Sequence, residues 1–375
     1  MNYIKNILPK ANSYPLLAKA TRNGSKSFST FYPVKSNSFN QQNLLPKTSK
    51  PVKHMLTLED YTPAEIFALV EKAHLFKRVS KATDLTEKEK LFKQNVASKM
   101  PLKGKTMALM FSKRSTRTRI STESSVAYLG GHAMFLGSQD IQLGVNESLL
   151  DSSKVISSMV DGIMARVNRH EDVLELSKYS KVPVINVLSD TNHPTEIIAD
   201  ILTMFEIFGK SGQTVEQAVK GLNVCWIGDS NNILYELIGA FPKCGINMKV
   251  STPAKYPIPQ PRLEKAKQEG LVDVVGSPSE AISGSDIIIT DTWISMGQES
   301  EKKQKLIDFV GYQITRELIE KSKPSEKWIF MHCLPIKPEE VDDEVFYSNR
   351  SVVFQEAENR KWTILSAIHS LLVEN

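Results

Sequence analysis

Apolar residues recur along the chain with two spacings, one typical of buried strands and one typical of helices. Short, mostly apolar runs alternate with longer segments in which apolar residues return every three or four positions. The strand-sized runs fall at residues 105–111, 133–136, 162–165, 183–186, 222–227, 247–251, 272–275, 286–290, 328–331 and 352–354. Because strands separated by helix-length segments form parallel sheets covered on both faces, the pattern predicts an α/β protein.

Helix signals lie between these runs. Thr62 followed by Pro63 is a typical helix start, with a hydroxyl cap and a proline at the first helical position. The charged stretch 81–99 is expected to be a surface loop with some helix. Further helices are expected at residues 117–129, 152–159, 195–208 and about 359–373. The helix at 195–208 separates two series of strands, so it is placed to bridge two domains.

The length of 375 residues also favours two domains over one. We expect a leader at residues 1–53, a first domain at 54–195, a bridging helix and linker at 196–220, a second domain at 221–355 and a C-terminal helix at 356–375. The expected fold is therefore α/β, with two domains that are each a parallel sheet flanked by helices and that are joined by long helices.

The net charge of +5 belongs to the leader. The first 58 residues hold nine of the 47 lysines and arginines and no acid, which leaves 38 basic against 42 acidic side chains in the rest of the chain. The charge therefore gives no reason to expect nucleic acid as a partner. Basic, serine-rich and acid-free sequence without a compact apolar core is typical of a mitochondrial transit peptide, here with cleavage near residues 22–31. The alternative is a disordered basic arm.

Two further features of the sequence limit where in the cell the protein is expected. No apolar run approaches the roughly 18 residues that a membrane span needs, so no membrane span is expected. The three cysteines, Cys225, Cys244 and Cys333, are odd in number and far apart, which fits a reducing interior and not a disulfide framework.

The segment 115–119 (STRTR) stands between a predicted strand and a predicted helix. Backbone N–H groups at a helix start are unpaired and carry partial positive charge. Hydroxyl groups and a guanidinium added there make a site suited to phosphate. A Gly-rich run ending in Gly-Lys-Ser/Thr is absent, so this is not a Walker loop. The alternative is a capped helix with exposed arginines.

The second series of strands opens with the segment 224–232 (VCWIGDSNN), where a dinucleotide-binding protein would carry G-x-G-x-x-G. The missing glycines argue against a dehydrogenase. Asn232, Asp291, the turn 295–297 (SMG) and the segment 332–335 (HCLP) each follow a predicted strand. Ligands of open α/β sheets bind beyond the carboxyl ends of the strands, so these residues should line one cleft. The sequence shows neither zinc-ligand spacing nor a Gly-x-Ser-x-Gly elbow.

Taken singly, these residues have structural explanations. His193 could cap a helix, Cys333 could be a small core residue, Asp291 a turn residue and Arg360 a solvated helix start. Taken together and in this order, STRTR, His-Pro-x-x, DTWISMG and HCLP resemble the aspartate/ornithine carbamoyltransferase family. The SMG turn and Cys333 resemble its ornithine branch. The resemblance runs from about residue 54 to the C-terminus and includes 144–149 (GVNESL) and 356–362 (EAENRKW).

The resemblance implies an enzyme that transfers the carbamoyl group of carbamoyl phosphate to the δ-amine of L-ornithine, giving L-citrulline. The reaction would serve arginine biosynthesis or the urea cycle in the mitochondrial matrix. It would need no cofactor and no metal, and the protein would be a homotrimer whose C-terminal helix returns to the first domain. Because carbamoyl phosphate already contains a good leaving group, the protein must only orient the amine and stabilise charge that develops on oxygen.

The family's site residues match this sequence position by position. The resemblance assigns carbamoyl phosphate to Ser115, Thr116, Arg117, Thr118, Gln142, Arg166, His193, Glu196, Cys333, Leu334 and Arg360, with Gln142 offered to a neighbouring subunit. It assigns ornithine to Asn232, Asp291, Ser295 and Met296, and the catalytic roles to Cys333, Arg166 and His193.

Two positions depart from the family pattern. Glu196 stands where the family has Gln in His-Pro-x-Gln, and Ile336 stands where it has Arg in His-Cys-Leu-Pro-Arg. An ionised Glu196 would add negative charge beside the phosphate, so we expect it to take up a proton when carbamoyl phosphate binds. The loss of a cation at Ile336 would weaken the attraction of anions.

Two alternatives remain at this point. One is a sister carbamoyltransferase that acts on aspartate, putrescine or an acylated ornithine. An aspartate enzyme should offer cations to its second substrate, whereas this chain offers Asp291 and a Ser-Met-Gly turn. The other alternative is a catalytically lapsed paralogue that only binds carbamoyl phosphate or a partner, which the two departures suggest.

Overall fold

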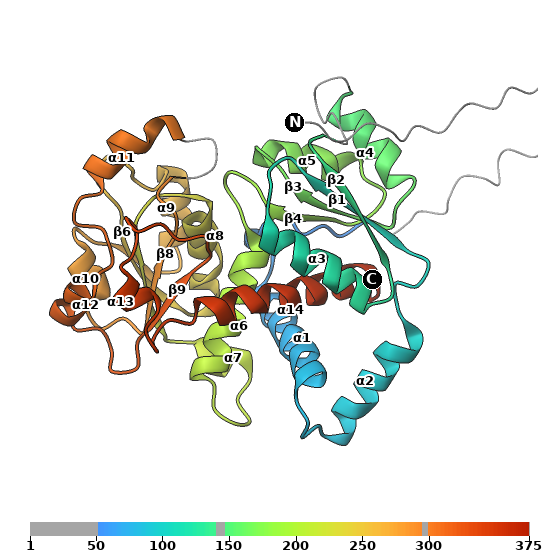
Figure 1. The fold of residues 1–375 in the computed structure, drawn as a ribbon, viewed down its shortest axis with the longest axis horizontal. Helices are drawn as coiled ribbons and strands as arrows, with labels where there is room; N and C mark the ends of the chain where they lie inside the picture. The colour runs from blue at the N-terminus through green and yellow to red at the C-terminus, as the bar shows by residue number, and fades with distance from the viewer. Residues whose placement is uncertain (1–51, 140–146, 295–298, 375) are drawn as a thin grey trace, which may run out of the picture. The chain divides into compact units, whose positions relative to one another are not determined.

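The computed structural model describes residues 52–139, 147–294 and 299–374 (Figure 1). Gln142, Ser295 and Met296, and nearly all of the expected leader, lie outside these ranges. None of the helices in the described ranges is long and apolar enough to cross a bilayer.

Two parallel sheets form the framework. The first sheet has the strand order β2-β1-β3-β4 and the second has the order β7-β6-β5-β8-β9. The strands are β1 (Thr106–Phe111), β2 (His132–Gly137), β3 (Gly162–Arg166), β4 (Val184–Leu188), β5 (Asn223–Ile227), β6 (Asn247–Ser251), β7 (Val272–Val274), β8 (Ile287–Thr290) and β9 (Ile329–His332). All neighbouring pairs are parallel, so the prediction of two α/β domains built on parallel sheets is confirmed.

Helices cover these sheets and connect them. The longer ones are α1 (Pro63–Lys81), α2 (Glu87–Lys99), α3 (Thr116–Tyr128), α4 (Leu149–Ser157), α5 (His170–Tyr179), α6 (Pro194–Phe208), α8 (Asn232–Ala240), α9 (Gln260–Lys267) and α14 (Val353–Leu372). The shorter ones are η2 (Leu58–Asp60), α7 (Val215–Val219), η3 (Pro242–Cys244), α10 (Pro278–Ile282), η4 (Glu299–Glu301), α11 (Lys302–Asp308), α12 (Arg316–Ser322) and α13 (Asp343–Phe346).

Two long helices join the domains. The helix α6 packs against β4 of the first sheet and against α8 of the second domain. The helix α14 begins beside β9 and then runs along α1, α3 and α6 (Figure 1). Their apolar faces share one core cluster with both sheets, which includes Leu109, Ile197, Trp226 and Ile364. These shared contacts hold the carboxyl ends of the two sets of strands near each other.

Helix starts follow the signals in the sequence. The hydroxyl of Thr62 accepts the N–H of Glu65, and the Glu65 carboxylate accepts the N–H of Thr62, which is the reciprocal capping box. At α3 the Ser115 side chain accepts the N–H of Thr118 at 3.3 Å. Each cap satisfies a backbone donor that the helix itself cannot pair.

Three element predictions were wrong. Residues 352–354 do not form a strand, because α14 already begins at Val353; only an isolated bridge joins Phe330 to Ser351. For the same reason the last helix begins six residues before the expected position 359. Most of the expected loop 81–99 is helix α2, which starts with a capping box between Thr86 and Glu89.

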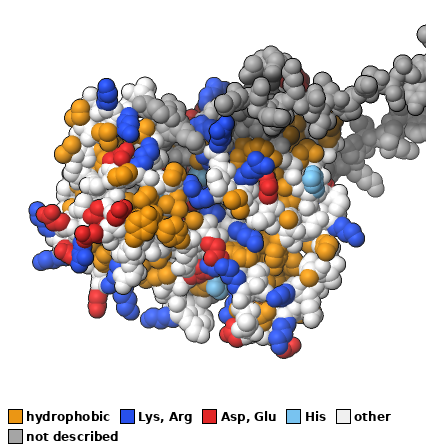
Figure 2. Space-filling model, in the orientation of Figure 1, with side chains coloured by type: hydrophobic (Ala, Val, Ile, Leu, Met, Phe, Trp, Pro, Cys, Tyr) orange, Lys and Arg blue, Asp and Glu red, His pale blue; other side chains and the backbone are white. Residues whose placement is uncertain are grey.

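Figure 2 shows one face of the molecule in the orientation of Figure 1. Acidic and basic side chains are intermingled over it, with hydrophobic side chains between them. Many of the exposed charges are paired, as in the ion pairs of Arg119 with Glu123 and of Arg316 with Glu320.

Candidate active site

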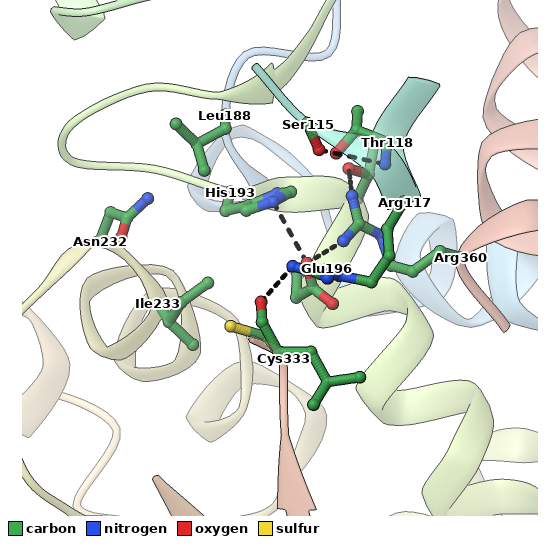
Figure 3. Close-up of polar contacts among 12 residues, drawn as sticks. Ser115, Arg117, Thr118, Leu188, His193, Glu196, Asn232, Ile233, Cys333 and Arg360 are labelled. Carbon is green, nitrogen blue, oxygen red and sulfur yellow. Dashed lines mark hydrogen bonds and ion pairs between the residues drawn. The ribbon is translucent and has the colours of Figure 1, made fainter. Parts of the chain in front are cut away.

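The predicted site residues that the structure describes lie at the carboxyl ends of strands from both sheets, and Figure 3 shows several of them. Ser115, Arg117 and Thr118 follow β1, and Arg166 ends β3. The residues that follow the other strands are His193 and Glu196 after β4, Asn232 after β5, Asp291 after β8 and Cys333 after β9. Arg360 reaches the same place from α14. This arrangement is the ligand site expected for open α/β sheets.

The start of α3 presents its backbone donors beside a guanidinium. Thr118 is buried at 2% exposure, whereas Thr116 is exposed. The Arg117 guanidinium donates to the backbone carbonyl of Leu334, which lies in the loop after β9 (Figure 3). A cation of the first domain therefore already contacts the loop of the second domain.

Three arginines lie close together in the site, the partly exposed Arg117 and the buried Arg166 and Arg360. Arg166 is 6% exposed and Arg360 is 2% exposed. Burial, followed by the charges of Arg360 and Arg117, lowers the pKa of Arg166 to about 10. The Nε atoms of Arg166 and Arg360 have no hydrogen-bond partner among the described residues. Such a cluster favours an anion, because an anion relieves the mutual repulsion and satisfies the unpaired donors.

Glu196 is the carboxylate that meets this cluster. It is 2% exposed, forms an ion pair with Arg360 and lies 3.2 Å from the Nε2 atom of His193 (Figure 3). Burial raises the pKa of Glu196, against the opposing effect of Arg360. Burial and the charges of Arg360 and Arg166 lower the pKa of His193 well below its usual value, so the imidazole is neutral at neutral pH. Its Nδ1 atom has no partner within the described ranges.

Two more carboxyl groups lie beneath Glu196. Asp200 comes from the next turn of α6 and Glu356 comes from α14, and both are buried at 2% exposure. Burial and the neighbouring acid Glu196 raise the pKa of Glu356 to about 8, while the Glu356 carboxylate accepts the N–H of His332 at 3.0 Å. Burial, followed by the charge of Glu356, raises the pKa of Asp200 well above its usual value. The raised pKa values favour the protonated form of the carboxyl groups of Asp200 and Glu356.

The second-domain side of the site is built around Asp291. Its Oδ1 accepts the thiol of Cys333 at 2.8 Å, and its Oδ2 accepts the Asn231 amide at 2.8 Å. Burial and the charge of Asp291 raise the pKa of the Cys333 thiol well above its usual value. The thiol therefore remains protonated and donates to Asp291. The Asn232 amide donates to the Ser189 carbonyl of the first domain at 2.9 Å.

A buried pair of side chains, His332 and Glu340, holds the loop that carries Cys333. The His332 Nε2 atom lies 3.1 Å from the Glu340 carboxylate, and the His332 Nδ1 atom accepts the N–H of Leu334 at 2.9 Å. Both side chains of the pair are fully buried. Leu334 has a φ of +58°, which a non-glycine residue adopts only where its surroundings enforce it. The pair thus directs the Leu334 carbonyl towards Arg117.

Among the residues that the structure describes, two groups of side chains lie close enough to hold a metal ion: Asp291 with His332 and Cys333, and Glu196 with Asp200 and Glu356. In the first group both ring nitrogens of the histidine already have hydrogen-bond partners, and the thiol donates to the carboxylate. In the second group the Arg360 guanidinium already supplies the positive charge. Protein groups therefore satisfy the first cluster without an ion, whereas in the second cluster the Oδ1 atom of Asp200 has no hydrogen-bond partner among the described residues.

Sequence reasoning missed several residues that shape this site. Asn231 caps α8 and holds Asp291, although the Asn-Asn pair at a helix start was visible in the sequence. Asp200 gives a signal as an acid within the apolar stripe of a predicted helix. Sequence reasoning assigned no role to Glu356 or Glu340. The Glu356 carboxylate accepts the N–H of His332, 24 residues before it, and the Glu340 carboxylate accepts the N–H of Trp293, 47 residues before it.

Comparisons with known proteins agree with this geometry. The family model for the carbamoyl-phosphate-binding domain of aspartate/ornithine carbamoyltransferases matches residues 53–206, and the model for the Asp/Orn-binding domain matches residues 220–371. The chain therefore belongs to the aspartate/ornithine carbamoyltransferase family.

The similar proteins come from the ornithine branch. The mitochondrial ornithine carbamoyltransferase of Emericella nidulans is 47% identical over 356 residues, covering 93% of this chain and 96% of that protein. The enzyme with the same name from Schizosaccharomyces pombe is 47% identical over 331 residues, covering 86% of this chain and 94% of that protein. The crystal structure of a mitochondrial ornithine carbamoyltransferase from Coccidioides immitis has a TM-score of 0.77 at 44% identity, covering 86% of this chain and 98% of that one.

Proposed function

We propose that this chain transfers the carbamoyl group of carbamoyl phosphate to the δ-amine of L-ornithine, giving L-citrulline and phosphate. The observation that carries the proposal is the cluster of Arg117 with the buried Arg166 and Arg360, at a site whose second-domain side is formed by Asp291 and Cys333. The similar proteins of known structure and name are ornithine carbamoyltransferases. The alternatives with aspartate or putrescine as acceptor find no support in these comparisons.

The residues then divide the work as follows. The hydroxyls and backbone of Ser115, Thr116 and Thr118 and the guanidinium of Arg117 bind the phosphate of carbamoyl phosphate, together with Gln142 of a neighbouring subunit. Arg166, His193, Glu196, Arg360 and the backbone at Cys333 and Leu334 surround the carbamoyl group. Asn232, Asp291, Ser295 and Met296 bind the amino-acid end of ornithine.

The chemistry needs orientation and charge stabilisation and no protein nucleophile. The neutral δ-amine attacks the carbonyl carbon, the bond to the phosphate oxygen breaks, and the amine proton leaves with the phosphate or to solvent. Arg166 and His193 donate to the carbonyl oxygen as charge develops on it. Since its pKa is raised, Cys333 acts as a thiol donor that orients Asp291 and the incoming amine.

In this mechanism the protonation state of Glu196 decides which ring nitrogen of His193 carries the proton. A protonated Glu196 donates to the Nε2 atom, which leaves the ring proton on Nδ1. An ionised Glu196 instead accepts from Nε2, and the Nδ1 atom becomes an acceptor that cannot stabilise a developing oxyanion. The protonated carboxyl is therefore the form that supports carbamoyl transfer.

The proposal extends to location and assembly. The named relatives are mitochondrial, and we assign this chain to the mitochondrial matrix, with residues 1–53 as transit peptide and leader. The assembly is a homotrimer, since the phosphate site takes Gln142 from a neighbour. The domains are residues 54–195 for carbamoyl phosphate, 196–220 as bridge, 221–355 for ornithine and 356–375 as the returning helix.

One assay tests the function. Purified protein lacking the leader should form citrulline from carbamoyl phosphate and ornithine, and aspartate or putrescine should give no carbamoylated product under the same conditions. Carbamoyl transfer to aspartate or putrescine in preference to ornithine would overturn the assignment. Binding of carbamoyl phosphate without turnover of any amine would identify a lapsed paralogue.

A further inference from the structure

A buried carboxylate in the second domain holds the segment that carries His193. Glu236 lies on α8, one helical turn after Asn232, and is 0% exposed. Its hydrogen-bond donors belong to two segments of the first domain, the chain before α1 and the loop between β4 and α6. None of the motifs in the sequence includes this residue.

The four contacts use the hydrogen-bond acceptor sites of both oxygens of the Glu236 carboxylate. One oxygen, Oε1, accepts the N–H of Leu58 at 2.5 Å and the hydroxyl of Thr57 at 3.0 Å. The other oxygen, Oε2, accepts the Asn192 amide at 2.7 Å and the backbone N–H of His193 at 3.2 Å. A carboxylate offers about four lone-pair sites, so each oxygen meets two donors.

The helix α8 holds the same loop at a second point. The Asn232 amide, one turn earlier, donates to the Ser189 carbonyl at 2.9 Å. Within the loop the N–H of Ser189 donates to the Asn192 carbonyl at 2.9 Å, which closes the turn. Hydrogen bonds to α8 hold both ends of this short loop. They fix the position of the His193 backbone relative to the second domain.

We propose that Glu236 is a positioning residue that fixes His193 against the carbamoyl group by tying its backbone to the ornithine side of the site. We call its four contacts the Glu236 clamp. The identity of the ligand rests on the proposed function, whereas the clamp itself rests on the four contacts. The clamp makes the placement of His193 depend on the helix that begins with Asn232.

The clamp requires an ionised carboxylate. In Glu236→Gln one oxygen becomes an NH₂ group, and in either orientation of the amide a backbone N–H, of Leu58 or of His193, then faces a donor. Burial raises the pKa of Glu236 to about 7, and the hydrogen bonds from Leu58, Asn192 and Thr57 oppose this shift. The clamp is therefore complete above about pH 7 and loses an acceptor as the pH falls below it.

The elements packed against α8 carry other charged or titratable side chains. Besides His193, which precedes α6, they are Glu196, Asp200 and Glu206 on α6, Glu59 and Asp60 on η2, Lys243 and Cys244 on η3, and Arg262, Glu264, Lys265 and Lys267 on α9. Glu59 forms ion pairs with Arg262 at 3.2 Å and with Lys265 at 2.5 Å, and it raises the pKa of Glu236. Glu59 thus joins the same two domains as the clamp without touching His193, which makes Glu59→Gln a matched control.

Ligand binding separates positioning from general damage. The probes are inorganic phosphate and the stable phosphonate analogue of carbamoyl phosphate in which a methylene replaces the ester oxygen, each titrated by calorimetry at pH 8. In Glu236→Gln the affinity for the analogue should fall tenfold or more, while the affinity for phosphate should change less than threefold. In Glu59→Gln the ratio of the two affinities should stay that of the wild type. Equal losses for both ligands in Glu236→Gln, or the same change of ratio in Glu59→Gln, overturn the clamp.

A second variant covers the case in which Glu236→Gln does not fold. Thr57→Val removes one donor to the ionised carboxylate, which raises the pKa of Glu236, so the fall in analogue affinity at low pH should begin at a higher pH than in the wild type. An unmoved pH profile overturns the clamp. Citrulline formation by the wild type is measured alongside. If the protein binds the analogue but forms no citrulline, the proposed function is wrong and the clamp still stands.

Discussion

Glu196 places a carboxyl group where the family motif carries a neutral amide, and the structure shows what surrounds it. The ion pair with Arg360 and the contact with His193 both place the carboxyl inside the site. Arg360 thus has an internal anion as its partner, and a phosphate of carbamoyl phosphate must compete with it. Protonation of Glu196 removes this competitor.

Glu196→Gln should therefore lower the KM for carbamoyl phosphate and flatten its pH dependence. Burial raises the pKa of Glu196, so rising pH ionises the group and adds repulsion. Above about pH 7, where Glu236 is ionised and the clamp is complete, the wild-type KM should therefore increase with pH. At about 6 Å and an effective dielectric near 20 the repulsion is roughly 3 kcal/mol per charge pair, most of it offset by the arginines. We expect about a tenfold lower KM at pH 8.5, measured by initial rates of citrulline formation.

Glu206→Gln is the control for this change. Glu206 lies ten residues later on α6, about 15 Å along the helix, and accepts hydrogen bonds from Lys77, Asn359 and Gln355. Its removal costs stability without touching the site, so the KM should keep its wild-type pH profile. A Glu196→Gln enzyme with an unchanged KM at every pH would show that the carboxyl does not oppose the substrate.

Arg117→Ala should raise the KM for carbamoyl phosphate and also lower kcat. The guanidinium faces the start of α3 and donates to the Leu334 carbonyl. A charged hydrogen bond is worth roughly 1.5–3 kcal/mol, which corresponds to a tenfold to hundredfold loss in kcat/KM. Arg119→Ala is the matched control, because Arg119 pairs with Glu123 on the exposed face of the same helix. Equal kinetics for the two variants would support the reading of segment 115–119 as a simple helix cap.

The residues that sequence reasoning placed in one cleft are those that follow strands. Position after a strand identified Arg117, Asp291 and Cys333, because parallel strands end at the same edge of a sheet. Sequence reasoning assigned no role to Glu236, Glu340 or Glu356, whose roles come from backbone groups that only the folded chain brings near them. A buried acid has no periodic signal, since its partners are distant in sequence.

At the scale of elements, apolar runs predicted the nine strands of the described ranges well but failed at residues 352–354. Val352 and Val353 are β-branched, and Val353 is buried against Ile314 and Phe330, so burial alone does not separate a strand from the first turn of a helix. The extent of the helix α2 was underestimated because its only buried residue is Val96, which gives it no apolar stripe. Its capping box was the signal that remained.

The capping boxes of α1 and α2 predict different responses to the same change. Thr62→Ala removes the cap of α1, whose face packs into the main core, and should lower the free energy of unfolding by about 1 kcal/mol. Thr86→Ala removes the cap of α2, which buries little, and should cause local fraying with almost no change in Tm. Thermal unfolding measures the first effect and amide hydrogen exchange measures the second. A larger fall in Tm for Thr86→Ala would mean that α2 belongs to the cooperative core.

At the scale of the whole molecule, the two domains contact each other through groups proposed to bind substrates. Arg117 of the first domain donates to Leu334 of the second, and Asn232 of the second donates to Ser189 of the first. The same groups must leave these partners to reach carbamoyl phosphate and ornithine. Binding at one half of the site therefore changes the contacts of the other half.

This coupling predicts an order of binding. Carbamoyl phosphate offers its phosphate to Arg117 and so releases the Leu334 carbonyl, after which the domains can close around ornithine. Ornithine alone meets Asp291 already engaged by Cys333 and Asn231, and Asn232 engaged by Ser189. We expect ornithine to bind at least tenfold more weakly without the phosphonate analogue of carbamoyl phosphate than with it, as measured by calorimetry.

The matched measurement uses Arg117→Ala. Without the guanidinium the analogue loses its link to the Leu334 loop, so adding it should increase the affinity for ornithine less than in the wild type. Linkage requires that ornithine tighten binding of the analogue by the same factor, which gives an internal check. If ornithine binds the wild type with equal affinity in the absence and presence of the analogue, the two halves of the site act independently. The contacts between Arg117 and Leu334 would then be a feature of packing alone.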